Sequence, residues 1–228
     1  MSGDLRYANV DPRAAAAKLA RDMIGAYASG WFPVDKNPDG PMLWNTVEQR
    51  AIIQPTVEGI ARVRRARRAH RWKFEVRPDE DFDVVLEACA VPHGNGVWLT
   101  GRLRDAYRVL RDMGFGRCCT AYDPAGEVAG GTLVVTIARA SFIETMFHWE
   151  SNAGNAALLG TLEVLLAEGC RLIDLQYLGS DHNKRFGAIE IPRHRYLELL
   201  REALEPPEPR TVHVPRRLRE SATQVPTT

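Results

Sequence analysis

The order of elements between residues 118 and 176 constrains the fold most. Three stretches there are predicted as strands, at about residues 118–122, 131–137 and 141–147. A short Arg-Ala turn joins the second stretch to the third, which is typical of a meander. Leucines then recur at helical spacing over 158–166, and Gly169 is placed to end that helix before an apolar strand at 172–175. This order predicts an α+β fold with a mixed β-sheet flanked by helices.

The rest of the chain adds helices and short strands ahead of this core. Helices are expected near 12–29, 58–70, 79–89 and 102–113, and strands near 42–44, 51–53 and 73–76. The turn-rich composition of residues 35–41 suggests a small N-terminal subdomain, residues 1–56, followed by a catalytic domain, residues 57–205. Residues 206–228, rich in Pro, Arg, Ser and Thr, are predicted to form a loosely ordered tail.

Composition narrows the class of protein. The 228 residues are 45% hydrophobic, enough for a core, and the net charge of +1 means that polyanion binding would need a local patch. No apolar run reaches the roughly 18 to 20 residues of a membrane span, and no export signal is visible, so a cytoplasmic monomer is expected. Four scattered cysteines without a C-x-x-C pair predict reduced thiols, no metal site and no cofactor.

Two polar residues interrupt the last apolar strand. Asp174 and Gln176 lie two positions apart, so on a strand both side chains would leave the same face. Because unpaired burial of such groups is costly, they must meet each other, a partner or a ligand. The pattern therefore suggests a site. The alternative is that Asp174 caps a turn and Gln176 faces solvent at the strand end.

Further motifs surround this pair. In chain order they are Ala26-Tyr27-x-x-Gly30-x-Phe32-Pro33; Met42-Leu43-Trp44 with Arg50 and Ile53 downstream; Trp98-Leu99-Thr100 followed by Ala106-Tyr107; Gly130-Gly131; Glu144-Thr145-Met146-Phe147 followed by Asn152-Ala153; and Asp174-x-Gln176, Asp181-His182 and Phe186-Gly187-Ala188-x-Glu190-Ile191-Pro192-Arg193-x-x-Tyr196. The ordered set closely resembles the motifs of the leucyl/phenylalanyl-tRNA-protein transferases, from about residue 20 to about residue 200. These bacterial enzymes move Leu or Phe from aminoacyl-tRNA to the N-terminal Arg or Lys of a protein, which marks it for degradation in the N-degron pathway.

The resemblance implies a fold and a set of roles. The family carries an acetyltransferase-like (GNAT-like) core and uses aminoacyl-tRNA and acceptor proteins as substrates. By resemblance, Gln176 accepts hydrogen from the attacking α-amine, and Asp174 and Glu144 support it and the positive side chain of the acceptor. Glu144 would be a carboxylate in an apolar strand, and acids near one site suit a cationic acceptor. The alternative for Glu144 is a surface ion pair at a strand end.

One absence supports this resemblance independently. Acetyltransferases that use acyl-CoA normally carry an R/Q-x-x-G-x-G/A loop, whose backbone N–H groups hold the pyrophosphate. At the equivalent place, residues 148–155 read His-Trp-Glu-Ser-Asn-Ala-Gly-Asn and contain no such motif. An acyl-CoA donor is therefore disfavoured.

Substrate-binding candidates follow from what a donor of this kind needs. A Leu or Phe side chain requires an apolar pocket, for which Phe142, Met146, Phe147 and Ile173 are candidates, although each could be ordinary core. Trp98 and Trp44 could stack on the terminal adenosine of tRNA, with packing inside the protein as the alternative.

A run of cations could bind RNA phosphates. Residues 62–73 contain seven Arg or Lys residues and no acid, with Arg64, Arg65 and Arg68 among them. Apolar residues recur there at every third position, and on a helix that series drifts by about 60° per step, so no clean buried stripe is expected. An RNA-binding face explains both observations, and a solvated face is the alternative.

The sequence departs from the family pattern in three places, and we expect these residues to lie at the rim of the site. Cys118-Cys119-Thr120-Ala121 stands where relatives read H-S-x-E, Asn152-Ala153-Gly154-Asn155 replaces N-A-S-K, and Asn45 replaces the second tryptophan of L-W-W. Two other functions therefore stay open. One is a related acyl- or aminoacyltransferase with a different donor or acceptor amine, and the other is a non-catalytic tRNA- or peptide-binding relative.

Overall fold

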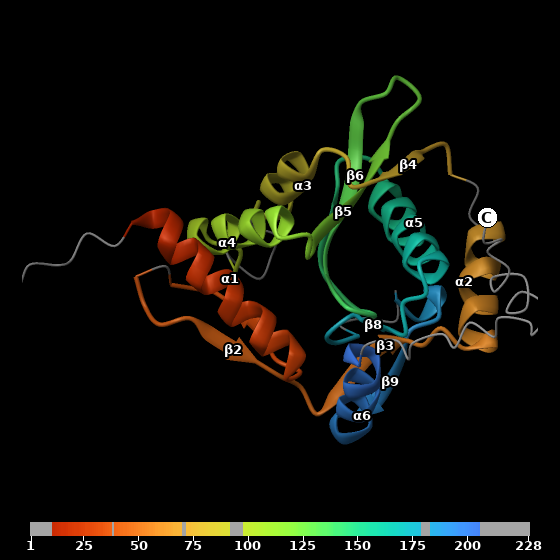
Figure 1. Cartoon of the computed structure of the whole chain (residues 1–228). Helices are drawn as coiled ribbons and strands as arrows, with labels where there is room; N and C mark the ends of the chain where they lie inside the picture. The colour runs from red at the N-terminus through yellow and green to blue at the C-terminus, as the bar shows by residue number, and fades with distance from the viewer. Residues whose placement is uncertain (1–10, 38, 70–71, 92–97, 179–182, 206–228) are drawn as a thin grey trace, which may run out of the picture.

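The computed structural model describes residues 11–37, 39–69, 72–91, 98–178 and 183–205 (Figure 1). The helices are α1 (Pro12–Ala28), α2 (Val57–Ala69), α3 (Phe82–Cys89), α4 (Gly101–Asp112), α5 (Ala153–Ala167) and α6 (Arg193–Leu204), with a 3₁₀ turn η1 (Asn183–Phe186). The strands are β1 (Phe32–Val34), β2 (Leu43–Asn45), β3 (Gln49–Ile53), β4 (Glu75–Pro78), β5 (Gly116–Tyr122), β6 (Val128–Ile137), β7 (Ala140–His148), β8 (Leu172–Asp174) and β9 (Ile189–Pro192).

Seven strands form one mixed sheet in the order β4-β5-β6-β7-β8-β3-β9. The β5–β6–β7 meander and the helix that precedes β8 confirm the predicted order of elements. Only the β7–β8 pairing is parallel among the described strands, because α5 returns the chain across the sheet before β8 begins. The α+β class with a mixed sheet flanked by helices is therefore confirmed.

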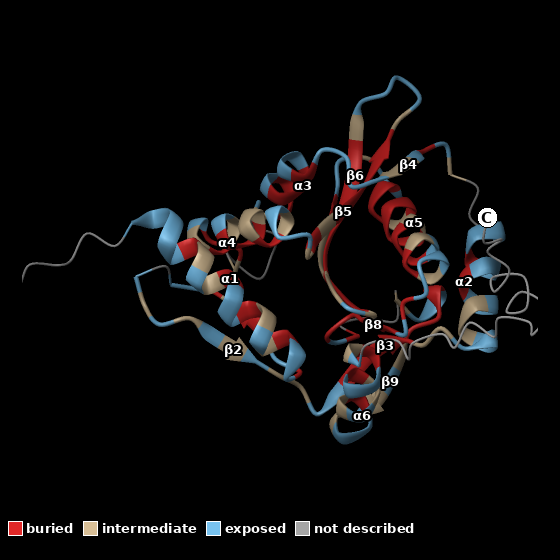
Figure 2. Cartoon of the chain, in the orientation of Figure 1, coloured by how far each residue is buried: buried red, intermediate tan, exposed pale blue. Residues whose placement is uncertain are grey.

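Helices cover both faces of this sheet. Successive side chains along each strand point to opposite faces, so each face packs into its own hydrophobic core. Leu133 and Val135 of β6 join the cluster shared with α1, α3, α4 and α6, whereas Val134 joins the cluster beneath α5 and α2. Figure 1 shows α5 and α2 on one side of the strands and α1, α3 and α4 on the other. Figure 2 shows the buried residues concentrated on the strands and on the inward sides of these helices.

Two glycines of β6 permit close approaches by its neighbours. A Cβ atom at Gly130 would lie 2.8 Å from Ala153 at the start of α5. A Cβ atom at Gly131 would lie 2.8 Å from the Phe147 ring. These separations are shorter than carbon–carbon contact, so the paired glycines allow α5 and β7 to pack against β6.

The N-terminal segment contributes to both sheets. β1 and β2 pair with each other in a two-stranded sheet, but β3 lies in the large sheet between β8 and β9. α1 packs on α4, which belongs to the predicted catalytic domain. The boundary at residue 56 remains a prediction about folding units. The predicted tail (residues 206–228) and the motif residues Asp181 and His182 lie outside the described residues.

Other expectations concern the cysteines and the membrane. Cys89, Cys118, Cys119 and Cys170 are all buried and free of disulfides, as predicted. None of the helices in the part of the chain that the structure describes combines the length and the apolar character needed to cross a bilayer.

Candidate active site

The apolar strand ends earlier than the sequence suggests. β8 stops at Asp174, and Gln176 has a φ of 64°. This is the left-handed region of backbone conformation, which residues other than Gly, Asn and Asp seldom adopt. β3 holds this turn from both sides, because Leu175 N donates to Ala51 O at 2.9 Å and Ala51 N donates to Gln176 O at 3.2 Å. The prediction that Asp174 and Gln176 both lie on a strand was therefore wrong at Gln176. Left-handed backbone at a non-glycine residue is typical of functional sites.

Asp174 is the centre of a buried ion pair with Arg50. Arg50 Nε donates to Oδ1 at 2.9 Å and Nη2 donates to Oδ2 at 2.7 Å, with the two side chains 1% and 0% exposed. Tyr196 Oη donates to Oδ2 at 2.7 Å, and Gln176 N donates to Oδ1 at 2.7 Å. Burial acts to lower the pKa of Arg50, but the adjacent Asp174 carboxylate raises it. Both Asp174 oxygens are engaged, so the structure gives this residue a positioning geometry.

A β-bulge directs Glu144 toward Gln176. The register passes from Leu133 opposite Thr145 to Val134 opposite Ile143, which leaves Glu144 as the extra residue of β7. Its Oε2 accepts from Gln176 Nε2 at 3.1 Å and from Tyr107 Oη at 2.9 Å.

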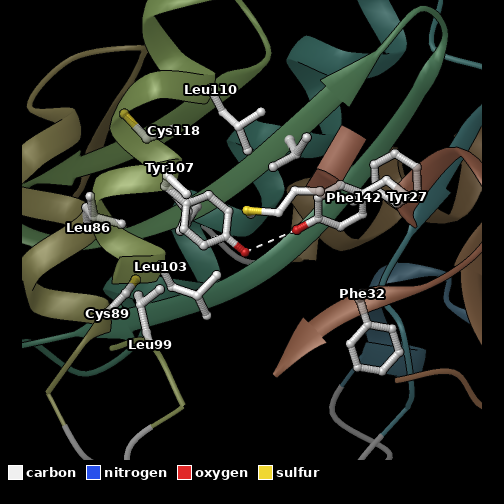
Figure 3. Packing of buried hydrophobic residues seen from close by; sticks show 14 of the residues in the cluster. Tyr27, Phe32, Leu86, Cys89, Leu99, Leu103, Tyr107, Leu110, Cys118 and Phe142 are labelled. Carbon is white, nitrogen blue, oxygen red and sulfur yellow. Dashed lines mark hydrogen bonds between the residues drawn. The ribbon is translucent and has the colours of Figure 1, made fainter. Parts of the chain in front are cut away.

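The hydrogen-bonded chain continues beyond Glu144 into the core. Tyr107 and Tyr27 lie with their hydroxyls 3.1 Å apart, as the dashed line in Figure 3 shows. Glu144 Oε1 is buried and has no hydrogen-bond partner in the described part of the chain. A buried carboxylate oxygen without a hydrogen-bond partner is costly and is therefore uncommon in folded proteins.

The environment of Glu144 shifts its protonation. Burial raises the pKa of Glu144 to about 7, although the hydrogen bond from Tyr107 and the nearby Tyr27 hydroxyl act in the opposite direction. The negative charge of Asp174 raises the pKa further, and the hydrogen bond from Gln176 lowers it. Both protonation states of Glu144 are therefore accessible near neutral pH, as acid-base chemistry requires.

Two cavities meet at this Glu144–Gln176 pair. The smaller, about 430 Å³, has walls of aliphatic side chains that include Ile143, Leu158 and Leu178. The larger, about 670 Å³, is lined by residues from the N-terminal segment and from the approach to α4. Residues shared by both are Glu144, Thr145, Met146, Gln176 and Tyr177. Groups bound in the two cavities would meet at the carboxylate and the amide.

The predicted substrate-binding residues fall in different places. Met146 lines both cavities and Trp98 lines the larger one. The structure does not bring Phe147 to either cavity, since it is 2% exposed and packs edge-on against Trp149 at 5.0 Å between ring centroids. Trp44 on β2 packs partly buried against the core and lines neither cavity.

The remaining candidates lie apart from the pair. Phe142 packs on Tyr27 at 4.8 Å between ring centroids, and Ile173 is fully buried beneath α5, so both are core residues. The exposed arginines Arg64, Arg65 and Arg68 are on α2, which packs on α5. Helix α2 lies on the opposite side of the large sheet from α1 and α4 (Figure 1).

Four residues of the network received no role from the sequence. They are Arg50, Tyr27, Tyr107 and Tyr196, and each belongs to a quoted motif. The signal that could have found them is the presence, within those motifs, of buried polar side chains that require partners.

The expected rim position of residues 118–121 was wrong. Cys118, Cys119, Thr120 and Ala121 are at most 3% exposed in β5, two strands away from β7. Thr120 Oγ1 donates to Glu80 O at 2.6 Å, so this segment serves packing beneath the helices. Asn45 does line the larger cavity, and Asn152 and Asn155 line a separate cavity of about 330 Å³ with Met146.

A metal centre is not apparent in the parts of the chain that can be described. No group of three or more His, Cys, Asp or Glu side chains in residues 11–205, outside the undescribed gaps, is arranged to hold an ion.

Comparisons with known proteins find relatives of this chain. The family model described as leucyl/phenylalanyl-tRNA protein transferase matches residues 53–201. Leucyl/phenylalanyl-tRNA–protein transferases from Rhodopseudomonas palustris (strain TIE-1) and Nitrobacter winogradskyi are each 37% identical to the chain. The first match covers 84% of this chain and 85% of the relative, and the second covers 80% and 81%. Among solved structures, a conserved protein of unknown function from Enterococcus faecalis V583, described as a probable N-acyltransferase, is similar with a TM-score of 0.43 and 13% identity, over 79% of this chain and 47% of that chain.

A buried acid–amide pair at the junction of two cavities is an arrangement that suits a group-transfer enzyme. The sequence matches show which class of group-transfer enzyme this is, namely an aminoacyltransferase. The chain belongs to the leucyl/phenylalanyl-tRNA–protein transferase family.

The buried ion pair gives a stability prediction. Arg50→Leu leaves the Asp174 carboxylate buried without its cation, so we expect the free energy of unfolding to fall by about 3–5 kcal/mol. Arg117→Leu is the matched control, because Arg117 also lies on a strand and pairs with Asp79 and Glu168, whose side chains are 47% and 49% exposed. That control should cost about 1 kcal/mol or less. Equal losses in urea denaturation would contradict the structural role of Arg50.

Proposed function

We propose that this enzyme transfers Leu or Phe from aminoacyl-tRNA to the N-terminal Arg or Lys of acceptor proteins. The observation that carries the proposal is the Glu144–Gln176 pair at the junction of two cavities, one of them aliphatic. A donor that occupies both cavities would have its ester beside this pair, where an acceptor amine could attack it. Positioning of this kind can supply roughly 7–11 kcal/mol of the barrier.

The reaction needs little more than orientation and removal of one proton. The aminoacyl ester is already activated, so the neutral α-amine attacks its carbonyl carbon, the C–O bond to the ribose breaks, and the ribose oxygen takes up a proton. Gln176 gives its Nε2–H to Glu144, which leaves the amide oxygen as the acceptor for an N–H of the attacking amine. Asp174 acts through the backbone of Gln176 and not on the substrate.

Glu144 suits the cationic acceptor. Glu144 lines both cavities, and an ammonium or guanidinium group bound beside it would neutralise its carboxylate. Burial gives Glu144 a pKa of about 7, and a nearby cation would favour the charged form. The carboxylate would thus gain its charge as the acceptor binds.

The two cavities suit the two ends of the aminoacyl-adenosine. The aliphatic walls of the smaller cavity fit the Leu or Phe side chain. Trp98 in the wall of the larger cavity offers an aromatic face on which the terminal adenine could stack. These assignments place the ester between them, beside Gln176.

The basic face of α2 suits the RNA body. Only Val63 and Ala66 of this helix are buried, in keeping with the absence of a wide apolar stripe. Arg62 pairs with Glu58, and Arg67 lies 3.6 Å from Glu163. Exposed cations on the same helix are Arg64, Arg65 and Arg68, which could approach phosphates.

The first test measures transfer itself. Purified enzyme is incubated with labelled Leu-tRNA or Phe-tRNA and with peptides that begin with Arg, Lys or a neutral residue. We expect label on the Arg and Lys peptides only, and a fall of about 100-fold or more for Gln176→Ala, because the amine loses its hydrogen-bond acceptor. Gln49→Ala, at an exposed position of β3, is the matched control and should keep the wild-type rate.

The outcomes of this test separate the remaining functions. Label on the neutral peptide would indicate a transferase with another acceptor amine. Binding of tRNA without any transfer would indicate a non-catalytic relative. A wild-type rate in Gln176→Ala would overturn the role given to Gln176.

The second test concerns α2. Replacement of Arg64, Arg65 and Arg68 by Ala should weaken tRNA binding, and the slope of log K against log salt concentration should become shallower by about 2 to 3. A control triple variant at Arg13, Arg21 and Arg171 removes the same charge from exposed positions elsewhere. If both triple variants keep the wild-type slope, the basic face of α2 is solvated and does not bind RNA.

A further inference from the structure

A buried carboxylate lies beside the larger cavity but belongs to no quoted motif. Asp35 follows β1 and is 1% exposed. Arg102 Nε donates to its Oδ2 at 2.6 Å, Arg102 Nη2 donates to its Oδ1 at 2.7 Å, and Thr100 Oγ1 donates to Oδ2. We call Asp35, Thr100 and Arg102 the Asp35 clamp.

The Asp35 clamp joins two segments that line the same cavity. Val34 and Lys36, on either side of Asp35, line the larger cavity together with Trp98. Asp35 N also donates to Trp98 O at 3.2 Å, so the backbone of the tryptophan is held directly. Arg102 extends the contacts to Gly40 O at 2.8 Å and Asn37 O at 3.1 Å.

Thr100 gives up an ordinary role to take part. It is the N-cap residue of α4, where a threonine hydroxyl normally accepts from a backbone N–H of the first turn. Its side chain makes no such capping bond and donates to Asp35 instead. The hydroxyl therefore serves the connection between the two segments at the expense of the helix end.

The carboxyl group of Asp35 is ionised at neutral pH. Burial by itself acts against ionisation of Asp35, but the hydrogen bonds from Arg102 and Thr100 outweigh it and lower the pKa of this carboxyl. A bidentate Arg–carboxylate pair also fixes orientation more strictly than a single contact does. The segment that carries Trp98 is thus tied by ionic and neutral hydrogen bonds together.

We propose that the Asp35 clamp is a positioning device that holds Trp98 in the orientation required to bind the terminal nucleoside of the donor. The inference rests on the proposed function, because it assigns the larger cavity to that nucleoside. None of the three residues contacts the reacting atoms. Asp35, Thr100 and Arg102 act through Trp98 and are positioning residues.

Steady-state transfer kinetics test the functional part. Asp35→Asn and Arg102→Lys should raise the KM for Leu-tRNA by about 10-fold and leave kcat and the KM for the Arg peptide within about twofold. Thr100→Val should behave like Asp35→Asn, whereas Thr100→Ser keeps the hydroxyl and should restore the wild-type KM. Asp79→Asn breaks an ion pair with Arg117 away from the cavity and is the control. An unchanged KM for Leu-tRNA in Asp35→Asn would overturn the proposal.

A second readout does not depend on transfer. In protein labelled with 5-fluorotryptophan, the ¹⁹F signal of Trp98, assigned with Trp98→Phe, should shift or broaden in Asp35→Asn while the other four tryptophan signals remain in place. Adenosine monophosphate should shift the Trp98 signal in the wild type and shift it less in Asp35→Asn. An unmoved Trp98 signal, or equal movement of all five signals, would overturn the positioning role. A wild-type enzyme without transfer would contradict the proposed function and leave this second readout intact.

Discussion

The buried ion pair between Arg50 and Asp174 is the interaction on which the site depends. It links neighbouring strands of the large sheet, β3 and β8, whose sequences lie 124 residues apart. Arg50 also lies between the rings of Phe32 and Tyr196, at 4.9 and 4.6 Å from their centroids, so β1 and α6 converge on the same guanidinium. Two charges removed from water cost several kcal/mol each, and only close pairing with further hydrogen bonds offsets that cost. Each donor around Asp174 therefore helps to offset the cost of burying it.

The ion pair reaches the chemistry through one backbone N–H. Asp174 Oδ1 accepts from Gln176 N, and this bond stabilises the left-handed turn that aims the Gln176 amide at Glu144. The two carboxylates consequently differ in environment. Asp174 is neutralised by an arginine, whereas Glu144 has only hydroxyl and amide partners and one unpaired oxygen. Separation of two acids by environment is a common way to give them different tasks.

Local patterns were sufficient to predict the meander, the helix before β8 and the class of sheet, because period and turn chemistry act over a few residues. The position of β3 between β8 and β9 was not predicted, since it depends on pairing with strands more than a hundred residues away. The bulge at Glu144 and the early end of β8 were not predicted either, because both depend on the register between neighbouring strands. Motif resemblance pointed to Glu144, Gln176 and Trp98, which line the larger cavity, but also to Trp44 and Phe147, which line neither cavity. Asp35 had no motif to mark it, and its partners became visible only in three dimensions.

The protonation of Glu144 reports on the whole arrangement, and ¹³C NMR of the Glu side-chain carboxyl carbons, assigned with Glu144→Gln, measures it directly. The pKa of Glu144 should be about 7 in the wild type. It should rise in Gln176→Ala, which removes a hydrogen bond to the carboxylate, and fall in Asp174→Asn, which removes a nearby negative charge. A Glu144 that titrates at its ordinary value near 4.5 in the wild type, or a pKa that neither variant moves, would contradict the coupling of Asp174, Gln176 and Glu144 in one site.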